Sequence, residues 1–167
     1  MAIQVIENFL SKIFFEDLKT LVLESEFAWF KRKTMVKNTT NNLGYFTHSF
    51  YNDHKINCNT YFKFILPILN NLNAKAIIEV RANLQPSVFF NKNGKTNFHI
   101  DNNYNCKTAI LYLNTNDGGT EFKFKDKIKF IQSEENKIIV FNSNIEHRAV
   151  TSKNCDFRYL INFNYFD

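Results

Sequence analysis

The triplet His99-Ile100-Asp101 lies at the end of a short expected strand, 96–100, and places an imidazole and a carboxylate two positions apart. Side chains at i and i+2 of a strand point to the same face, so both can reach one metal ion. The pair alone is weak evidence, because a chain of this composition can produce it by chance. It gains weight from a third imidazole, His147, which begins a later expected strand. Two histidines and one carboxylate form the facial triad that binds non-haem Fe(II) and leaves coordination positions open.

The triplet belongs to a region rich in expected strands. From residue 76 onward, short runs with β-branched and aromatic residues alternate with Asn, Gly and Asp turns, which predicts a small β-sandwich or barrel. The expected strands are 76–84, 96–100, 106–114, 120–124, 128–131, 137–141, 147–150 and 156–165.

The N-terminal part of the chain has a different pattern. Apolar residues recur at three- and four-residue steps over 6–23 and again over 61–72, which predicts two helices on one side of the β-core. Between them, the polar segment 32–59 contains an aromatic stretch, 45–51, that fits either a strand or a loop closing over a site. The fold class expected from these patterns is mainly β with helical support (α+β).

Length and composition set broad limits. The chain has 167 residues, 44% of them hydrophobic, with no secretion signal and no run near the ~18 apolar residues of a spanning helix. We expect one cytoplasmic domain, 1–167, with helical support and substrate loops in 1–75 and the β-core in 76–167. Its three cysteines are too far apart for a CxxC zinc site, and their odd number argues against a disulfide framework.

The chain is basic, with a net charge of +5 and a pI near 9.1. However, Asn, Lys, Ile and Phe are all heavily used, as in AT-rich coding, and no basic cluster is longer than Lys31-Arg32-Lys33. The charge therefore leaves nucleic acid open as a partner without favouring it.

The last expected strand carries Arg158, eleven residues after His147. An arginine inside a small barrel is costly unless it has an anionic partner. A dicarboxylate would supply one, held by the two parallel N–H groups of the guanidinium.

Several motifs now occur in one order: His99-Ile100-Asp101, His147, and Arg158-Tyr159-Leu160-Ile161 in the final strand. The segments 110–114 and 116–122 add to them. Together they resemble the 2-oxoglutarate/Fe(II)-dependent dioxygenases, in particular the prolyl-4-hydroxylase-like branch and its small bacteriophage-encoded members. The resemblance covers about residues 76–167. It implies a double-stranded β-helix (jelly roll) with N-terminal helices, and an enzyme that couples decarboxylation of 2-oxoglutarate to hydroxylation of a second substrate.

Carried over residue by residue, the resemblance makes His99, Asp101 and His147 the Fe(II) ligands. It makes Arg158 the partner of the distal carboxylate of 2-oxoglutarate, with the hydroxyl of Tyr112 as a second donor. Ile110 and Asn162 would line the same cosubstrate pocket. The family also allows ascorbate as a reductant and, for phage-encoded members, action in the cytoplasm of a bacterial host.

Three residues are expected near the primary substrate: Asn83 on an earlier strand, His48 in the aromatic stretch, and Asn164 in the final strand. Asn164 replaces a tryptophan of the prolyl hydroxylases, and Asn162 replaces a small hydroxyl residue. Phe89 or Phe90 stands where the animal oxygen-sensing enzymes have a tyrosine that contacts the cosubstrate. These departures leave the cosubstrate clamp intact and argue against proline as the substrate.

Two other functions remain open at this stage. A nucleic-acid oxidative dealkylase is mildly favoured by the pI, although its final strand usually has two arginines where this chain has Arg158 alone. A cupin-like metal-binding module without enzymatic activity would need neither Arg158 nor Tyr112. The sequence does not identify the primary substrate, which could be a protein side chain such as proline or a small molecule.

Overall fold

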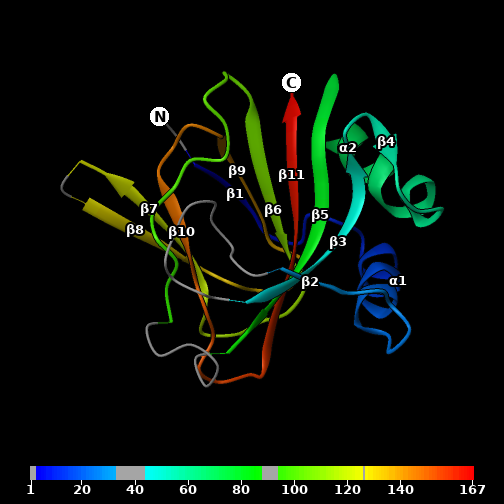
Figure 1. Cartoon of the computed structure of the whole chain (residues 1–167), viewed down its shortest axis with the longest axis horizontal. Helices are drawn as coiled ribbons and strands as arrows, with labels where there is room; N and C mark the ends of the chain where they lie inside the picture. Colours follow the sequence, from blue (N-terminus) through cyan, green and yellow to red (C-terminus); the bar gives the residue numbers. More distant parts are fainter. Residues whose placement is uncertain (1–2, 33–43, 88–93, 126) are drawn as a thin grey trace.

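The computed structural model describes residues 3–32, 44–87, 94–125 and 127–167 and is built mainly from antiparallel strands (Figure 1). Its helices are α1 (Lys12–Leu23) and α2 (Leu66–Asn71), the latter preceded by a π-helical turn, η1 (Tyr61–Ile65). The strands are β1 (Gln4–Ile6), β2 (Phe30–Arg32), β3 (Tyr45–Asn52), β4 (Lys55–Ile56), β5 (Ala76–Pro86), β6 (Lys107–Tyr112), β7 (Gly119–Phe124), β8 (Lys127–Gln132), β9 (Ile138–Asn142), β10 (His147–Val150) and β11 (Phe157–Phe166).

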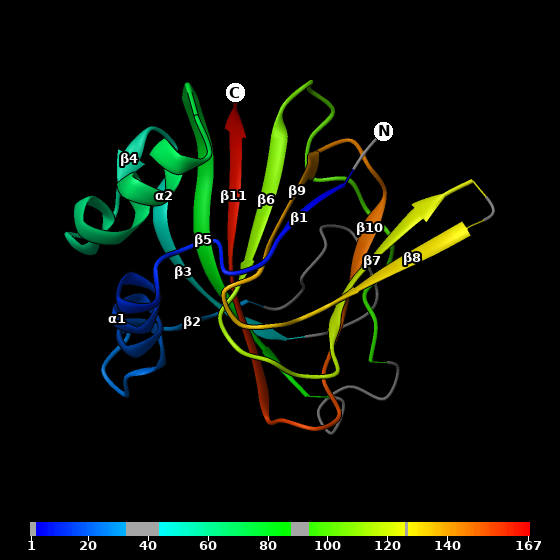
Figure 2. The same ribbon diagram turned by 180° about the vertical axis from the view of Figure 1, so that it is seen from behind.

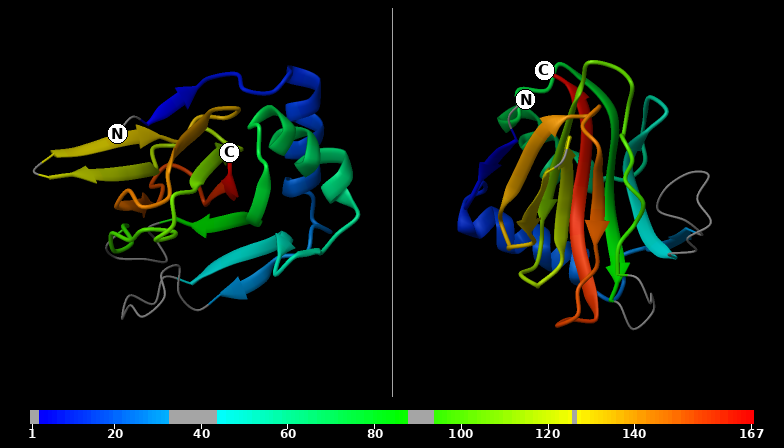
Figure 3. Two further views of the ribbon diagram at one scale, coloured as in Figure 1. Left: turned by 90° about the horizontal axis from the view of Figure 1, so that it is seen from above. Right: turned by 90° about the vertical axis from the view of Figure 1, so that its left-hand side faces the viewer.

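The strands form a large and a small sheet. The large sheet has the order β1-β9-β6-β11-β5-β3-β2, with β4 paired to β3, and the small sheet has the order β10-β7-β8. Seen from above, the helices lie on one side of the large sheet and the β7–β8 hairpin on the other (Figure 3). This is the double-stranded β-helix arrangement, so the expected mainly-β class and the jelly roll are confirmed.

The expected strand 96–100 is present only as isolated bridges. Lys95 pairs with Val150, and His99 pairs with His147 through two backbone hydrogen bonds of 2.9 Å. Between these bridges, the N–H of Thr96 donates to the carbonyl of Ala149 at 3.0 Å, but the N–H of Ala149 donates to the hydroxyl of Thr96 and not to a backbone carbonyl. The side chain thus interrupts the ladder, and the segment extends the small sheet without becoming a regular strand.

The first expected helix begins at residue 12, not at 6. Residues 4–6 instead form β1, which pairs with β9 at the edge of the large sheet (Figure 2). Asn8 then turns the chain with a φ of 50°, and Asn136 holds the following segment through hydrogen bonds to both the N–H and the carbonyl of Leu10. Periodicity could not reveal these distant partners.

The second helix agrees with the expected 61–72, although its first turn is π-helical and Pro67 lies at the start of α2. The aromatic stretch 45–51 is a strand, β3, paired with β5. No helix within the described ranges is long and apolar enough to cross a membrane.

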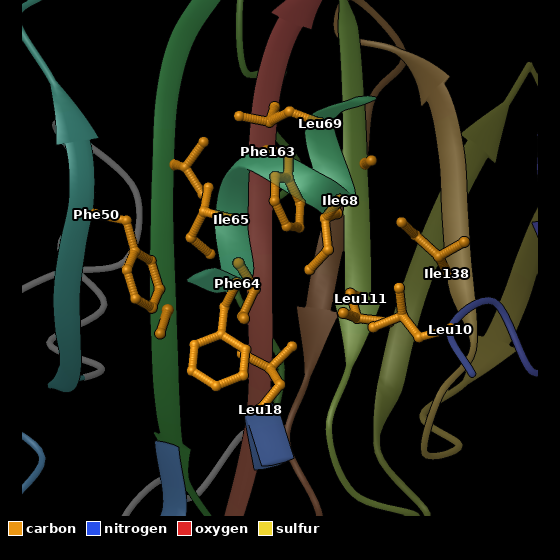
Figure 4. Close-up of a cluster of buried hydrophobic side chains, with 14 of the residues drawn as sticks. Leu10, Leu18, Phe50, Phe64, Ile65, Ile68, Leu69, Leu111, Ile138 and Phe163 are labelled. Carbon is orange, nitrogen blue, oxygen red and sulfur yellow. The ribbon is translucent and has the colours of Figure 1, made fainter. Parts of the chain in front are cut away.

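The main hydrophobic core lies between the helices and the outer face of the large sheet (Figure 4). Strand β11 contributes alternate residues to it: Ile161, Phe163 and Tyr165. Arg158, Leu160 and Asn162 on the same strand face the space between the two sheets, because successive side chains of a strand point to opposite faces. The helices therefore bury one face of the sheet and leave the other face for a site.

We expect Ile65→Ala, in η1, to lower the free energy of unfolding by about 2–5 kcal/mol, since its side chain is fully buried against the sheet. Ile13→Ala is the matched control: Ile13 is helical too, but 79% exposed, and its loss should cost less than ~0.5 kcal/mol. Urea denaturation measures both changes. Equal losses would contradict the placement of the core.

Candidate active site

The structure brings the three expected metal ligands together between the sheets. His99 lies on the segment bridged to β10, Asp101 follows it, and His147 begins β10. The Oδ1 atom of Asp101 is 3.6 Å from Nε2 of each histidine, and one ligand atom from each residue lies within 4.8 Å of the others. Such spacing allows one ion to contact all three.

Backbone carbonyls orient both imidazoles. Nδ1 of His99 is 3.2 Å from the carbonyl of Asn97, and Nδ1 of His147 is 2.9 Å from that of Ile145. A proton on Nδ1 satisfies each contact and leaves the Nε2 lone pair directed toward Asp101. Burial, followed by the proximity of His147, lowers the pKa of His99, although Asp101 opposes the shift. Both effects favour the neutral ligand form, so this donor set fits a divalent metal such as Fe(II).

The carboxylate of Asp101 is held from behind by Thr108 on β6. The Thr108 hydroxyl donates to Oδ2 at 2.9 Å, which leaves Oδ1 facing the histidines. Thr108 also contacts the Ser143 hydroxyl at 2.9 Å and the Asn164 side chain at 2.8 Å. Asn164, expected at the substrate, therefore lies in the network behind the metal ligand and not in the pocket wall.

The guanidinium of Arg158 lies at the other end of the pocket and is 1% exposed. Its N–H groups donate to Gln85, directly opposite on β5, and to Thr120 at 3.4 Å, whereas Nε has no partner in the part of the chain that the structure describes. No carboxylate among the described residues forms a salt bridge with it. Burial lowers the pKa of Arg158 because it disfavours the charged form. Within the described ranges, the site thus holds a buried cation whose hydrogen-bond partners are neutral polar groups.

Tyr112 packs beside this cation. Its ring centroid is 5.1 Å from the guanidinium carbon of Arg158, and its hydroxyl donates to Thr120 at 2.8 Å. Burial raises the pKa of Tyr112 while the charge of Arg158 opposes the shift, so the phenol stays protonated and can donate. Thr120 therefore links the two groups expected to clamp a carboxylate.

One pocket connects the triad to Arg158. Of the other expected residues, Ile110, Asn162 and Asn83 line it, while Tyr112 supports it from behind. Its lining comprises Tyr45, Arg81, Asn83, Gln85, Thr96, His99, Asp101, Ile110, Thr120, His147, Ala149, Arg158, Leu160 and Asn162.

His48, expected at the substrate, is on the opposite face of β3. Its ring lies 4.4 Å from that of Phe27 and 4.9 Å from that of Phe50, both in the core beneath the helices. Nδ1 contacts the carbonyl of Ala28 at 2.9 Å. Tyr45 and Thr47 are two positions apart on β3 and share its inner face. His48 follows Thr47 directly, so the alternation of the strand directs its side chain away from the pocket.

Phe89 and Phe90 lie outside the described residues, as does 33–43 of the expected substrate loop. Sequence reasoning also missed residues that the structure places at the site. Thr108 was recognisable as sharing a strand face with Ile110 and Tyr112. Gln85 and Tyr45 had no such signal, because their positions depend on the register between β5, β3 and β11.

An ion-pair cluster fastens the ligand-bearing segments together on the outer side of the small sheet. Glu121 on β7 contacts Lys95 at 2.7 Å and Arg148 at 2.7 Å. Lys95 precedes His99 on its segment, and Arg148 follows His147. Burial alone would raise the pKa of Glu121, but the hydrogen bonds from both cations outweigh it and lower that pKa.

Comparison with solved structures identifies the same fold in oxygenases. A prolyl hydroxylase from Trichoplax adhaerens, in complex with a peptide of hypoxia inducible factor, is 19% identical, with a TM-score of 0.72 over 99% of this chain and 83% of that chain. A Burkholderia pseudomallei oxidoreductase of the 2OG-Fe(II) oxygenase family is 10% identical, with a TM-score of 0.73 over 98% and 84%. The epimerase SnoN, in complex with Fe3+, alpha ketoglutarate and nogalamycin RO, is 11% identical, with a TM-score of 0.68 over 99% and 78%.

No family model and no curated protein sequence matches the chain. At these sequence identities the structural matches establish the fold. Evidence for the function comes from the geometry of the triad and of Arg158.

We expect Thr108→Val to weaken binding of Co(II), used as a stable substitute for Fe(II), by about 10- to 100-fold, because Asp101 loses the donor that orients it. Thr108→Ser keeps the hydroxyl and should restore most of the affinity. Metal titration with calorimetric detection measures both. Equal affinities in the valine and serine variants would show that the hydroxyl has no orienting role.

We expect Glu121→Gln to lower the free energy of unfolding at pH 7 by about 1–2 kcal/mol, since two charge-assisted contacts weaken. Because the folded-state pKa of Glu121 is lowered, its contribution is present above the usual value of 4.5 and lost as the pH falls through the lowered value. The variant should therefore show a shallower loss of stability in acid. Glu146→Gln, in an exposed pair with Lys123, is the control and should cost less than ~0.5 kcal/mol.

Proposed function

We propose that the protein is a 2-oxoglutarate- and Fe(II)-dependent dioxygenase that hydroxylates a second substrate. One observation carries the proposal: a single pocket has a facial triad at one end and a buried, unneutralised arginine at the other. The triad needs a metal, and Arg158 needs an anion. A dicarboxylate that also chelates the metal satisfies both requirements, whereas a plain metal-binding module explains only the triad.

His99, Asp101 and His147 would hold the iron, each already oriented by a hydrogen bond. Bound Fe(II) together with 2-oxoglutarate supplies the oxygen-activating chemistry that a protein side chain cannot provide. Arg158 would bind the distal carboxylate with the Thr120 hydroxyl as a neighbouring donor, and Tyr112, which donates to Thr120, would hold that hydroxyl in place. Ile110 and Leu160 would cover the chain of the diacid and exclude water.

The structural neighbours support this assignment at the level of the fold. SnoN binds Fe3+ and alpha ketoglutarate, and the Trichoplax enzyme binds a peptide. A protein side chain or a small molecule therefore remains the favoured substrate class here. The N-terminal layer 1–75 shares one hydrophobic cluster with the core 76–167, which supports a single oxygenase domain. The sequence resemblance to phage-encoded members further supports action in the cytoplasm of a bacterial host.

The test is the release of CO2 from carboxyl-labelled 2-oxoglutarate, measured with Fe(II)-loaded protein in air. We expect slow release that requires Fe(II) and dioxygen and is abolished by Asp101→Ala. Arg158→Gln should raise the KM for 2-oxoglutarate about 10- to 100-fold, the effect of removing one or two charged hydrogen bonds.

Glu146→Gln is the matched control for expression and purification of a variant protein. It should behave as wild type, because Glu146 lies on the surface away from the pocket. Iron binding without any 2-oxoglutarate turnover would contradict the proposal and favour the cupin-like module.

A further inference from the structure

The pocket contains a second arginine that the cosubstrate does not explain. Arg81 projects from β5 into the same wall as Asn83 and Gln85. Glu79 contacts it through Nη1, at 3.2 Å, whereas Nε is buried and has no hydrogen-bond partner among the residues that the structure describes. A guanidinium carries five N–H donors in a planar fork, so the edge that includes Nε remains available to another acceptor.

Strand register places Arg81 at the level of the metal. Along β11, Arg158 lies opposite Gln85, and Asn162, four residues further on, lies opposite Arg81. Four residues of strand span roughly 13 Å, so the two arginines serve different ends of the pocket. The carboxylate of Asp101, an expected metal ligand, is also close enough for its charge to act on Arg81. A diacid with one carboxylate at Arg158 and the other at the metal leaves Arg81 without a role.

Two amide oxygens near Arg81 are also without partners. Oδ1 of Asn83 and Oδ1 of Asn162 are buried and accept no hydrogen bond from any described residue, and the two residues are 6% and 7% exposed. Leaving such groups unpaired is unfavourable, so a ligand with both an anionic group and N–H or O–H donors would satisfy them. Together with Arg81 they form a polar wall beside the metal, which we call the Arg81 wall.

Building on the proposed function, we propose that the primary substrate carries an oxyanion, a carboxylate or a phosphate, which binds Arg81 beside the metal. Asn83 and Asn162 accept hydrogen bonds from polar groups of the same molecule. Glu79 is the partner of Arg81 through Nη1, and its negative charge opposes the binding of the oxyanion at the other edge. An unsubstituted proline side chain in an otherwise apolar setting would leave all three groups of the Arg81 wall unpaired.

The experiment uses Co(II)-loaded protein saturated with 2-oxoglutarate, with acetate and methylphosphonate as separate probes at constant ionic strength. The visible absorption of Co(II) reports on binding beside the metal. We expect a saturable change with at least one anion, and the more effective probe distinguishes a carboxylate from a phosphate substrate.

Arg81→Gln should raise the half-saturating anion concentration about tenfold or more, and Arg81→Lys should restore part of the response. Glu79→Gln should lower that concentration, because it removes a negative charge that repels the anion. The affinity for 2-oxoglutarate should stay within about threefold of wild type in all three variants. If Arg81→Gln does not fold, the other two variants still test the inference: Arg81→Lys should weaken anion binding relative to wild type, and Glu79→Gln should strengthen it.

Three results would overturn the inference: no saturable change with either anion, equal responses in wild type and Arg81→Gln, or a loss of 2-oxoglutarate affinity in Arg81→Gln. The last would assign Arg81 to the cosubstrate. Failure of the proposed function is distinguishable, because 2-oxoglutarate itself would then leave the Co(II) spectrum of wild-type protein unchanged before any anion is added.

Discussion

The site depends on a guanidinium buried without a carboxylate partner among the described residues. Arg158 lies inside the fold at 1% exposure, contacted by Gln85, Thr120 and the ring of Tyr112. Removing a charge from water is expensive unless an opposite charge replaces the solvent. The rest of the protein must therefore supply the stability that keeps Arg158 in place, and the function must supply the anion that neutralises it.

The stability comes from the opposite face of the same strand. In β11, Ile161, Phe163 and Tyr165 pack under the helices, while Arg158 and Asn162 face the pocket. The hydrophobic layer between helices and sheet thus carries the folding energy, and the inner face can hold polar groups that would otherwise destabilise a core. This division explains why a chain of 167 residues devotes its N-terminal part to covering the sheet.

The sequence was informative where local spacing decides geometry. The i, i+2 spacing of His99 and Asp101 indicated a shared face for two metal ligands, and the strand-like runs from residue 76 onward indicated a β-sandwich or barrel. The jelly roll and the complete ligand set were implied by the resemblance to the dioxygenases. The prediction that His48 lies at the substrate was wrong, because alternation tells which residues of a strand share a face but not which face points into the pocket. Gln85 and Arg81 acquire their places from pairings with residues more than twenty positions away, and no short-range pattern contains that information. Thr108 shares a strand face with Ile110 and Tyr112, but its contact with Asp101 depends on how the loop between these two residues folds.

The central claim is that one pocket holds a metal at the triad and a diacid at Arg158. The most direct measurement is an anaerobic titration of the Fe(II)-loaded protein with 2-oxoglutarate, followed by visible absorption. Chelation of the metal by the keto acid gives a metal-to-ligand charge-transfer band, and we expect this band to appear and saturate. Iron bound at the triad with no band at saturating 2-oxoglutarate would contradict the account.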